Sequence, residues 1–169
     1  MIPTLFIIGA FILVFGFVVA FGAPYVPSLR KEVYSAFNEL YPIGRGDTVV
    51  DLGSGDGSIL LAASKKGARC VGVELNPVLA AISRFRLRKR ADVKLGNMWL
   101  MLLPAETTLV YAFVVSRDTK RLKILMQNES NRLNKEIFLM TFGAALPGKQ
   151  PTKIRKAHSL YSFKPLQVD

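Results

Sequence analysis

A short run of acids and glycines is the part of this sequence best suited to chemistry. The run is Asp51-Leu52-Gly53-Ser54-Gly55-Asp56-Gly57, and it follows the apolar residues Val49 and Val50. Glycines let a backbone turn tightly and approach a ligand without side-chain collision. A helix that begins after such a turn offers free amide groups. We therefore expect all seven residues of the run to line a cofactor site.

Two classes of cofactor suit a turn of this kind. A dinucleotide site has the spacing G-x-G-x-x-G, with the pyrophosphate at the helix N-terminus. Here Gly57 comes one residue early, and the carboxylates of Asp51 and Asp56 would repel a pyrophosphate. These acids suit a ligand with an amino group, a sulfonium and no phosphate, which is S-adenosylmethionine (SAM). An NAD-dependent enzyme is the distant alternative.

Two later segments supply groups for the nucleoside end of this cofactor. Glu74 ends an apolar run, where an acid can accept hydrogen bonds from both ribose hydroxyls, and the residues after it extend the site. Those residues are Leu75 and Asn76. Adenine needs an edge acceptor and apolar faces, which three consecutive residues can provide: Asn97, Met98 and Trp99. A plain core role is the competing interpretation for Trp99.

Strands and helices alternate through most of the chain. The pattern predicts strands at 48–52, 69–74, 92–95, 107–115 and 136–142, and helices at 29–41, 58–66, 77–90 and 118–133. Strict alternation favours a Rossmann-like α/β fold, a mostly parallel sheet with helices on both faces. A Gly/Pro-rich loop around residue 147 replaces a helix. The last strand, within 152–163, is therefore expected to pair antiparallel at an edge.

The first 29 residues contain no charged side chain, and residues 2–23 form one apolar run. As a helix this run is roughly 33 Å long, close to the roughly 30 Å hydrocarbon core of a bilayer. Residues 1–23 are therefore expected to form a single transmembrane anchor. A signal peptide and a buried core helix are the alternatives, but no basic segment precedes the apolar run. Arg30 and Lys31 follow it, which predicts a C-terminal domain on the cytoplasmic side.

The formal net charge of +11 points to an acidic partner. The densest basic cluster comprises Arg84, Arg86, Arg88, Lys89 and Arg90. With an anchor nearby, we expect this cluster to contact an anionic membrane surface. Nucleic acid and an inert solvated helix face are the alternatives. His158 and Cys70 are the only residues of their types, so neither a His-rich metal site nor an intrachain disulfide is expected.

Four segments, PYVPS, DLGSGDGSILLAA, VGVELNP and GNMWL, resemble class I (seven-β-strand) SAM-dependent methyltransferases. They are similar to a small membrane-anchored protein-lysine methyltransferase family, whose members modify the adenine nucleotide translocase and the ATP synthase c subunit. The resemblance implies that residues 24–47 cover the cofactor, with Tyr25 and Ser28 in this lid. Residues 48–169 would form the methyltransferase domain. The glycine run would hold the methionine end of SAM and Glu74 the ribose, while Asn97 stands where many relatives have aspartate.

The function that this resemblance implies is methylation of lysine on a membrane-associated protein. A methyltransferase for a lipid or other small molecule and a non-catalytic SAM-binding module are the alternatives. The Asn/Asp-Pro-Pro-Tyr signature of amide and nucleobase amino methyltransferases is missing, which argues against a nucleic acid substrate. Tyr111 and Asp118 are candidates for orienting the lysine amine. Otherwise Tyr111 is a core residue and Asp118 caps the following helix.

Overall fold

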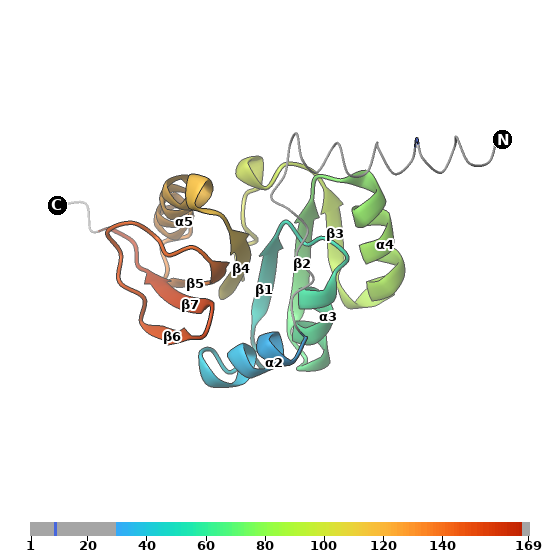
Figure 1. Cartoon of the computed structure of the whole chain (residues 1–169), viewed down its shortest axis with the longest axis horizontal. Helices are drawn as coiled ribbons and strands as arrows, with labels where there is room; N and C mark the ends of the chain where they lie inside the picture. Colours follow the sequence, from blue (N-terminus) through green and yellow to red (C-terminus); the bar gives the residue numbers. More distant parts are fainter. Residues whose placement is uncertain (1–8, 10–29, 167–169) are drawn as a thin grey trace.

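The computed structural model describes Gly9 and residues 30–166. The strands of this part are β1 (Thr48–Leu52), β2 (Arg69–Glu74), β3 (Asp92–Leu95), β4 (Leu109–Val114), β5 (Ile137–Gly143), β6 (Lys153–Arg155) and β7 (His158–Phe163). They form one sheet in the order β3-β2-β1-β4-β5-β7-β6 (Figure 1). β1 to β5 are parallel, whereas β7 is antiparallel to β5 and to β6. The predicted mostly parallel α/β sheet is confirmed.

Helices cover both faces of the sheet. They are α2 (Arg30–Glu39), α3 (Ser58–Lys65), α4 (Pro77–Leu87) and α5 (Thr119–Leu133). Apolar residues of α2 and α3, among them the fully buried Phe37 and Leu60, pack on one face. α5 packs on the other face through Leu122 and Met126. All residues of β1 are buried between these layers, as is usual for a central parallel strand.

The chain order places a switch point at the end of β1. β1 pairs with β2 on one side and with β4 on the other, so the crossovers leave β1 in opposite directions across the sheet. In open parallel sheets the crevice outside this point is where ligands bind. The glycine run follows β1 directly and therefore lies at this edge.

Two expected boundaries are wrong. The helix predicted at 77–90 ends at Leu87, because Arg88 has a φ of 50° and a ψ of −120° that stop the α-helix. A short 3-10 turn, η1 (Arg88–Arg90), follows. The last strand pairs antiparallel as predicted, but β7 is not at the edge. β6 occupies the edge, and with three residues it is too short to show a strand pattern in the sequence.

The predicted anchor and lid lie outside the described residues. Apart from Gly9, residues 1–23 are not among the described residues, and neither are Tyr25 and Ser28. Across residues 30–166, none of the helices combines the length and the apolar composition that a bilayer span requires.

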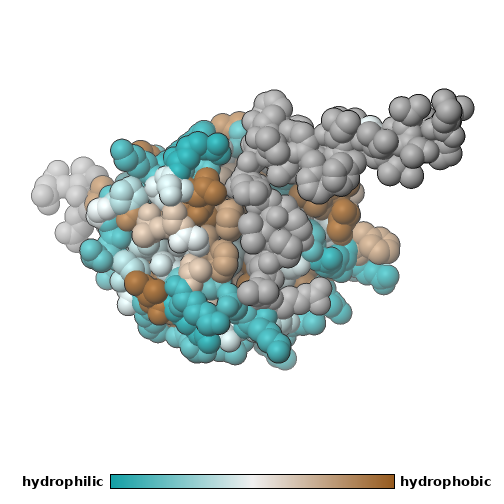
Figure 2. Space-filling model, viewed as in Figure 1, coloured by the Kyte–Doolittle hydropathy of each residue, from teal (hydrophilic) through white to brown (hydrophobic). Residues whose placement is uncertain are grey.

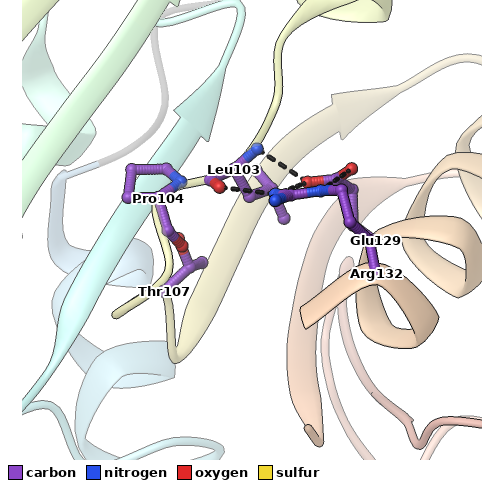
Figure 3. Close-up of polar contacts among 5 residues, drawn as sticks. All are labelled: Leu103, Pro104, Thr107, Glu129 and Arg132. Carbon is purple, nitrogen blue, oxygen red and sulfur yellow. Dashed lines mark hydrogen bonds and ion pairs between the residues drawn. The ribbon is translucent and has the colours of Figure 1, made fainter. Parts of the chain in front are cut away.

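An ion pair on α5 holds the segment that leads into β4 (Figure 3). Glu129 Oε2 accepts a hydrogen bond from the Leu103 amide at 2.7 Å, and Arg132 donates to the Leu103 carbonyl at 2.7 Å. Arg132 also donates to both carboxylate oxygens of Glu129, at 2.9 and 2.6 Å. Burial acts to raise the pKa of Glu129, but the hydrogen bonds from Arg132 and Leu103 outweigh it, and the pKa lies below 4.5.

We expect Glu129→Ala to lower the free energy of unfolding by about 2–3 kcal/mol, because the Leu103 amide and Arg132 lose their partner. Urea unfolding at pH 7 measures this change. The matched control is Glu106→Ala, which removes a 3.4 Å ion pair between two side chains that are more than half exposed. That control should change stability by less than about 0.5 kcal/mol. Equal losses in the two variants would contradict the role assigned to Glu129.

Candidate functional site

The turn after β1 is fastened to the neighbouring strand β2. The amides of Gly53 and Ser54 both donate to the Val73 carbonyl, each at 2.9 Å. Gly53 and Gly57 have φ angles of 85° and 79°, a left-handed conformation that glycine adopts without strain. No described atom lies within 4 Å of the place that a Cβ on Gly53 would occupy. The backbone of the turn is thus open to a ligand at Gly53.

Glu74 joins this turn to the start of α4. One carboxylate oxygen accepts a hydrogen bond from the Gly55 amide and the other from the Asn76 amide, both at 2.8 Å. The residue is 9% exposed. Because each carboxylate oxygen has two lone pairs, each keeps one acceptor position. Glu74 can therefore still accept hydrogen bonds from two neighbouring hydroxyls of a ligand.

Asp51 carries a buried oxygen whose hydrogen bonding is incomplete. The residue is 2% exposed, and its Oδ2 has no hydrogen-bond partner among the described residues. Burial, followed by the charges of Glu74 and Asp56, raises the pKa of Asp51 well above its usual 3.8. A buried carboxylate without a partner destabilises a fold. A ligand cation beside Asp51 would offset this penalty, so the carboxylate fits a positively charged ligand.

Asp56 is bonded within the protein. Its Oδ1 accepts hydrogen bonds from the amide and the hydroxyl of Ser58, at 3.1 and 2.7 Å. Its Oδ2 forms an ion pair with Arg86 of α4. The sequence grouped Arg86 with the surface basic cluster, whereas the structure directs its guanidinium onto Asp56. The acids left to face a cationic ligand are therefore Asp51 and Glu74, and not the pair Asp51 and Asp56.

The residues that follow β2 have separate tasks. Asn76 Oδ1 accepts hydrogen bonds from the amides of Val78 and Leu79, at 2.9 and 3.2 Å, and so caps the N-terminus of α4. Leu75 is 38% exposed at the end of the strand. Asn76 thus acts on the fold through its side chain, while Leu75 offers an apolar surface beside Glu74.

The residues that follow β3 form a short 3-10 turn, η2 (Met98–Leu100). Asn97 caps this turn, with its Oδ1 accepting the Trp99 amide at 3.0 Å. Met98 and Trp99 are half-buried against the core on the α5 face. The Arg121 guanidinium of α5 lies over the Trp99 ring, 4.5 Å from its centroid. Trp99 is therefore partly a core residue, and Arg121 is a neighbour that the sequence did not suggest.

The two residues proposed to orient a lysine amine are not brought together with the glycine turn. Tyr111 is 2% exposed in β4, and its hydroxyl lies 3.1 Å from Nε2 of His158. Its ring meets Phe37 of α2 edge to face, with 6.0 Å between centroids. Asp118 bonds Arg117 at 3.2 Å and stands at the N-cap of α5 without a side-chain capping bond. The core interpretation describes Tyr111.

Comparison with curated proteins identifies lysine methyltransferases. The ATP synthase C-subunit lysine N-methyltransferase of Xenopus laevis is 49% identical over 63 residues, which are 37% of this chain and 27% of that protein. The chain thus spans about a quarter of the length of the first relatives it matches. The protein-lysine N-methyltransferase of Saccharolobus islandicus (strain REY15A) is 33% identical over 113 residues, 63% of this chain and 69% of that protein. No family model matches the chain.

Solved structures share the fold. An RNA methyltransferase from Salinibacter ruber, in complex with S-adenosyl-L-homocysteine, superposes with a TM-score of 0.72 at 22% identity. The match covers 85% of this chain and 97% of that one. The sheet order, the acidic glycine turn after β1 and the sequence match to most of the Saccharolobus protein agree, and the chain belongs to the protein-lysine N-methyltransferase family of class I methyltransferases.

Proposed function

We propose that this protein binds SAM at the carboxyl ends of β1 and β2 and methylates lysine on a membrane-associated protein. The observation that carries the proposal is the buried carboxylate of Asp51, whose Oδ2 lacks a partner among the described residues beside the open glycine turn. The ammonium of a bound amino acid supplies the positive charge that this carboxylate needs. A dinucleotide would instead bring its pyrophosphate against Asp51 and Glu74.

The remaining groups divide between the ends of the cofactor. Glu74 would accept hydrogen bonds from the ribose hydroxyls with its free lone pairs, and Gly53 would let the backbone approach the methionine part. Leu75, Met98 and Trp99 would contact the adenine ring. Asn97 would use its amide at the adenine edge, since its oxygen already accepts one backbone hydrogen bond.

SAM supplies an activated methyl group, and the protein supplies alignment and a neutral amine. Tyr111 is engaged with His158 inside the core, and Asp118 is engaged with Arg117. Burial lowers the pKa of His158 from 6.5, with smaller opposing effects from Glu32 and Arg155, so this ring is neutral at pH 7. We therefore assign the lysine proton to solvent water and no catalytic base to a side chain.

The membrane location is part of the proposal. Residues 1–23 would anchor the chain, residues 24–47 would cover the cofactor, and residues 48–169 would act on the cytoplasmic side. Two groups of relatives are named as lysine methyltransferases of the ATP synthase c subunit and of the adenine nucleotide translocase, and these names support a protein acceptor at a membrane. The net charge of +11 supports contact with anionic lipid.

Two measurements test the function. Calorimetry of the full chain should show binding of SAM and S-adenosylhomocysteine and no binding of NAD. Membranes incubated with methyl-labelled SAM and the protein should then carry the label on lysine, as mass increments of one CH2 group. Label found only in extracted lipid would replace the protein acceptor with a lipid. Binding of SAM without transfer to any membrane component would reduce the chain to a SAM-binding module.

A further inference from the structure

α4 carries an apolar stripe on the side that faces away from the sheet. Ala80, Ser83 and Leu87 form its buried side. At about 100° per residue, three apolar residues at four- and three-residue spacing lie on the opposite side. They are Val78, Ile82 and Phe85, which are 47%, 43% and 79% exposed. A helix that meets only water on this side normally carries polar residues there.

Basic residues flank this stripe. Between residues 76 and 95 the chain has six Lys or Arg residues and one acid, Asp92. The Nε of Arg84 donates to the Val93 carbonyl at 2.8 Å, and Arg86 is paired with Asp56. The three residues of η1 are exposed and form no ion pair with any described residue: Arg88, Lys89 and Arg90. The positive charge at the end of α4 is therefore available to a partner.

The apolar surface continues at the edge of the sheet. Leu75 and Leu95, which follow or end the neighbouring strands β2 and β3, are 38% and 52% exposed. Figure 2 shows apolar side chains gathered over α4 with hydrophilic side chains next to them. The patch therefore runs from the end of β3 along the outer side of α4 to η1.

We propose that this side of α4 docks on the anionic leaflet of a lipid bilayer, with the apolar stripe between the headgroups and the η1 cations on lipid phosphates. An apolar stripe bordered by Lys and Arg is the pattern of helices that lie in a membrane interface. Each such cation strengthens binding to an anionic surface about fivefold. A basic protein surface would instead be repelled by the net charge of +11. The inference rests on the membrane location proposed above and not on methyl transfer.

Docking in this way would position the candidate SAM site. α4 begins directly after Glu74, so its first turn and Leu75 belong to the edge where the cofactor residues lie. A bilayer along α4 therefore borders the opening of the site. A lysine close to the membrane surface could reach the site, whereas one far from the membrane could not.

A dye placed on the stripe tests the docking in the full chain. Phe85→Cys is labelled with an environment-sensitive maleimide, and Ile124→Cys on α5, at a residue 60% exposed, is the matched control. The native Cys70 stays unlabelled because burial, followed by the charge of Asp51, raises its thiol pKa to about 12. Both proteins are reconstituted into vesicles of phosphatidylcholine alone or with phosphatidylserine.

We expect phosphatidylserine to shift the emission of the dye at position 85 to the blue and to shield it from iodide, with no change at position 124. Replacing all three η1 cations with glutamine should lower the ratio of shielded to accessible dye about a hundredfold. Equal access of iodide in both kinds of vesicle would overturn the proposal. Shielding that grows with protein concentration would overturn it too, because a second copy would then cover the stripe.

A SAM titration of the same labelled protein separates the two proposals. SAM binding without shielding would reject the docking and leave the proposed function intact. Shielding without SAM binding would do the reverse.

Discussion

Asp51→Asn should weaken SAM binding about 10- to 100-fold and at the same time raise the stability of the protein without ligand at neutral pH. The loss of affinity follows because a hydrogen bond to a charged group contributes about 1.5–3 kcal/mol. The gain in stability follows because the buried carboxylate, with Oδ2 unpaired among the described residues, is replaced by a neutral group of the same shape. Calorimetry and thermal unfolding measure the two effects.

The stability effect has a defined pH dependence. The pKa of Asp51 in the folded protein is raised above 3.8, chiefly by burial and then by the charges of Glu74 and Asp56. A raised pKa means that the folded protein binds the proton more tightly, so the contribution of Asp51 to stability is lost as pH rises through the folded pKa. The Asp51→Asn variant lacks this loss. The difference in Tm should therefore be small below pH 4 and should favour the variant increasingly as pH rises.

Asp92→Asn is the matched control for Asp51→Asn. Asp92 is exposed at the start of β3, so neither SAM affinity nor the pH dependence of Tm should change. Unchanged SAM affinity in the Asp51→Asn variant would show that this carboxylate does not hold the cofactor. A fall in its Tm at neutral pH would show that the carboxylate stabilises the fold without ligand, contrary to the geometry.

Gly72→Ala should destabilise the protein by about 1–3 kcal/mol and weaken SAM binding, because it adds an atom between the sheet and the glycine turn. Gly72 pairs with Asp51 in the sheet. A Cβ at this position would lie 2.6 Å from Leu60 Cδ1 and 2.9 Å from Cβ and Oγ of Ser54. α3 and the turn would both have to move away from β2. Thermal unfolding and SAM titration report the two consequences.

The same substitution at Gly96 gives a close comparison. A Cβ there has Val73 Cγ2 as its nearest neighbour, at 3.7 Å, which is an ordinary contact. Gly96→Ala should therefore leave the free energy of unfolding within about 0.5 kcal/mol of the native value. Similar losses for the two alanine variants would mean that β2 does not determine the position of the turn.

Local pattern was sufficient for most of the elements. β1, β2 and β3 begin and end at the predicted residues, because short apolar runs between polar turns identify buried strands. The alternation of strands and helices also predicted a parallel sheet, and hence that Asp51 and Glu74 lie at the same edge. The two boundaries that failed, at Arg88 and at β6, depend on single backbone angles and on a three-residue pairing.

The electrostatic state of the site needed the tertiary structure. Asp56 and Arg86 are 30 residues apart, and Glu74 and Gly55 are 19 apart, so nothing in the local sequence pairs them. The sequence showed that acids surround the turn, but burial and partners decide which of them meets a ligand. Asp56 is neutralised by Arg86, whereas Asp51 is buried with an unsatisfied oxygen.

By itself the sequence determined the order of elements, the acidic glycine turn at the end of β1 and the apolar character of the first 29 residues. These are properties of neighbouring residues, and periodicity and composition express them directly. Only the tertiary structure decided that Tyr111 and His158 share the core, that Glu129 holds the Leu103 backbone, and that α4 exposes an apolar stripe. Such features depend on which side of an element is covered by residues far away in the chain.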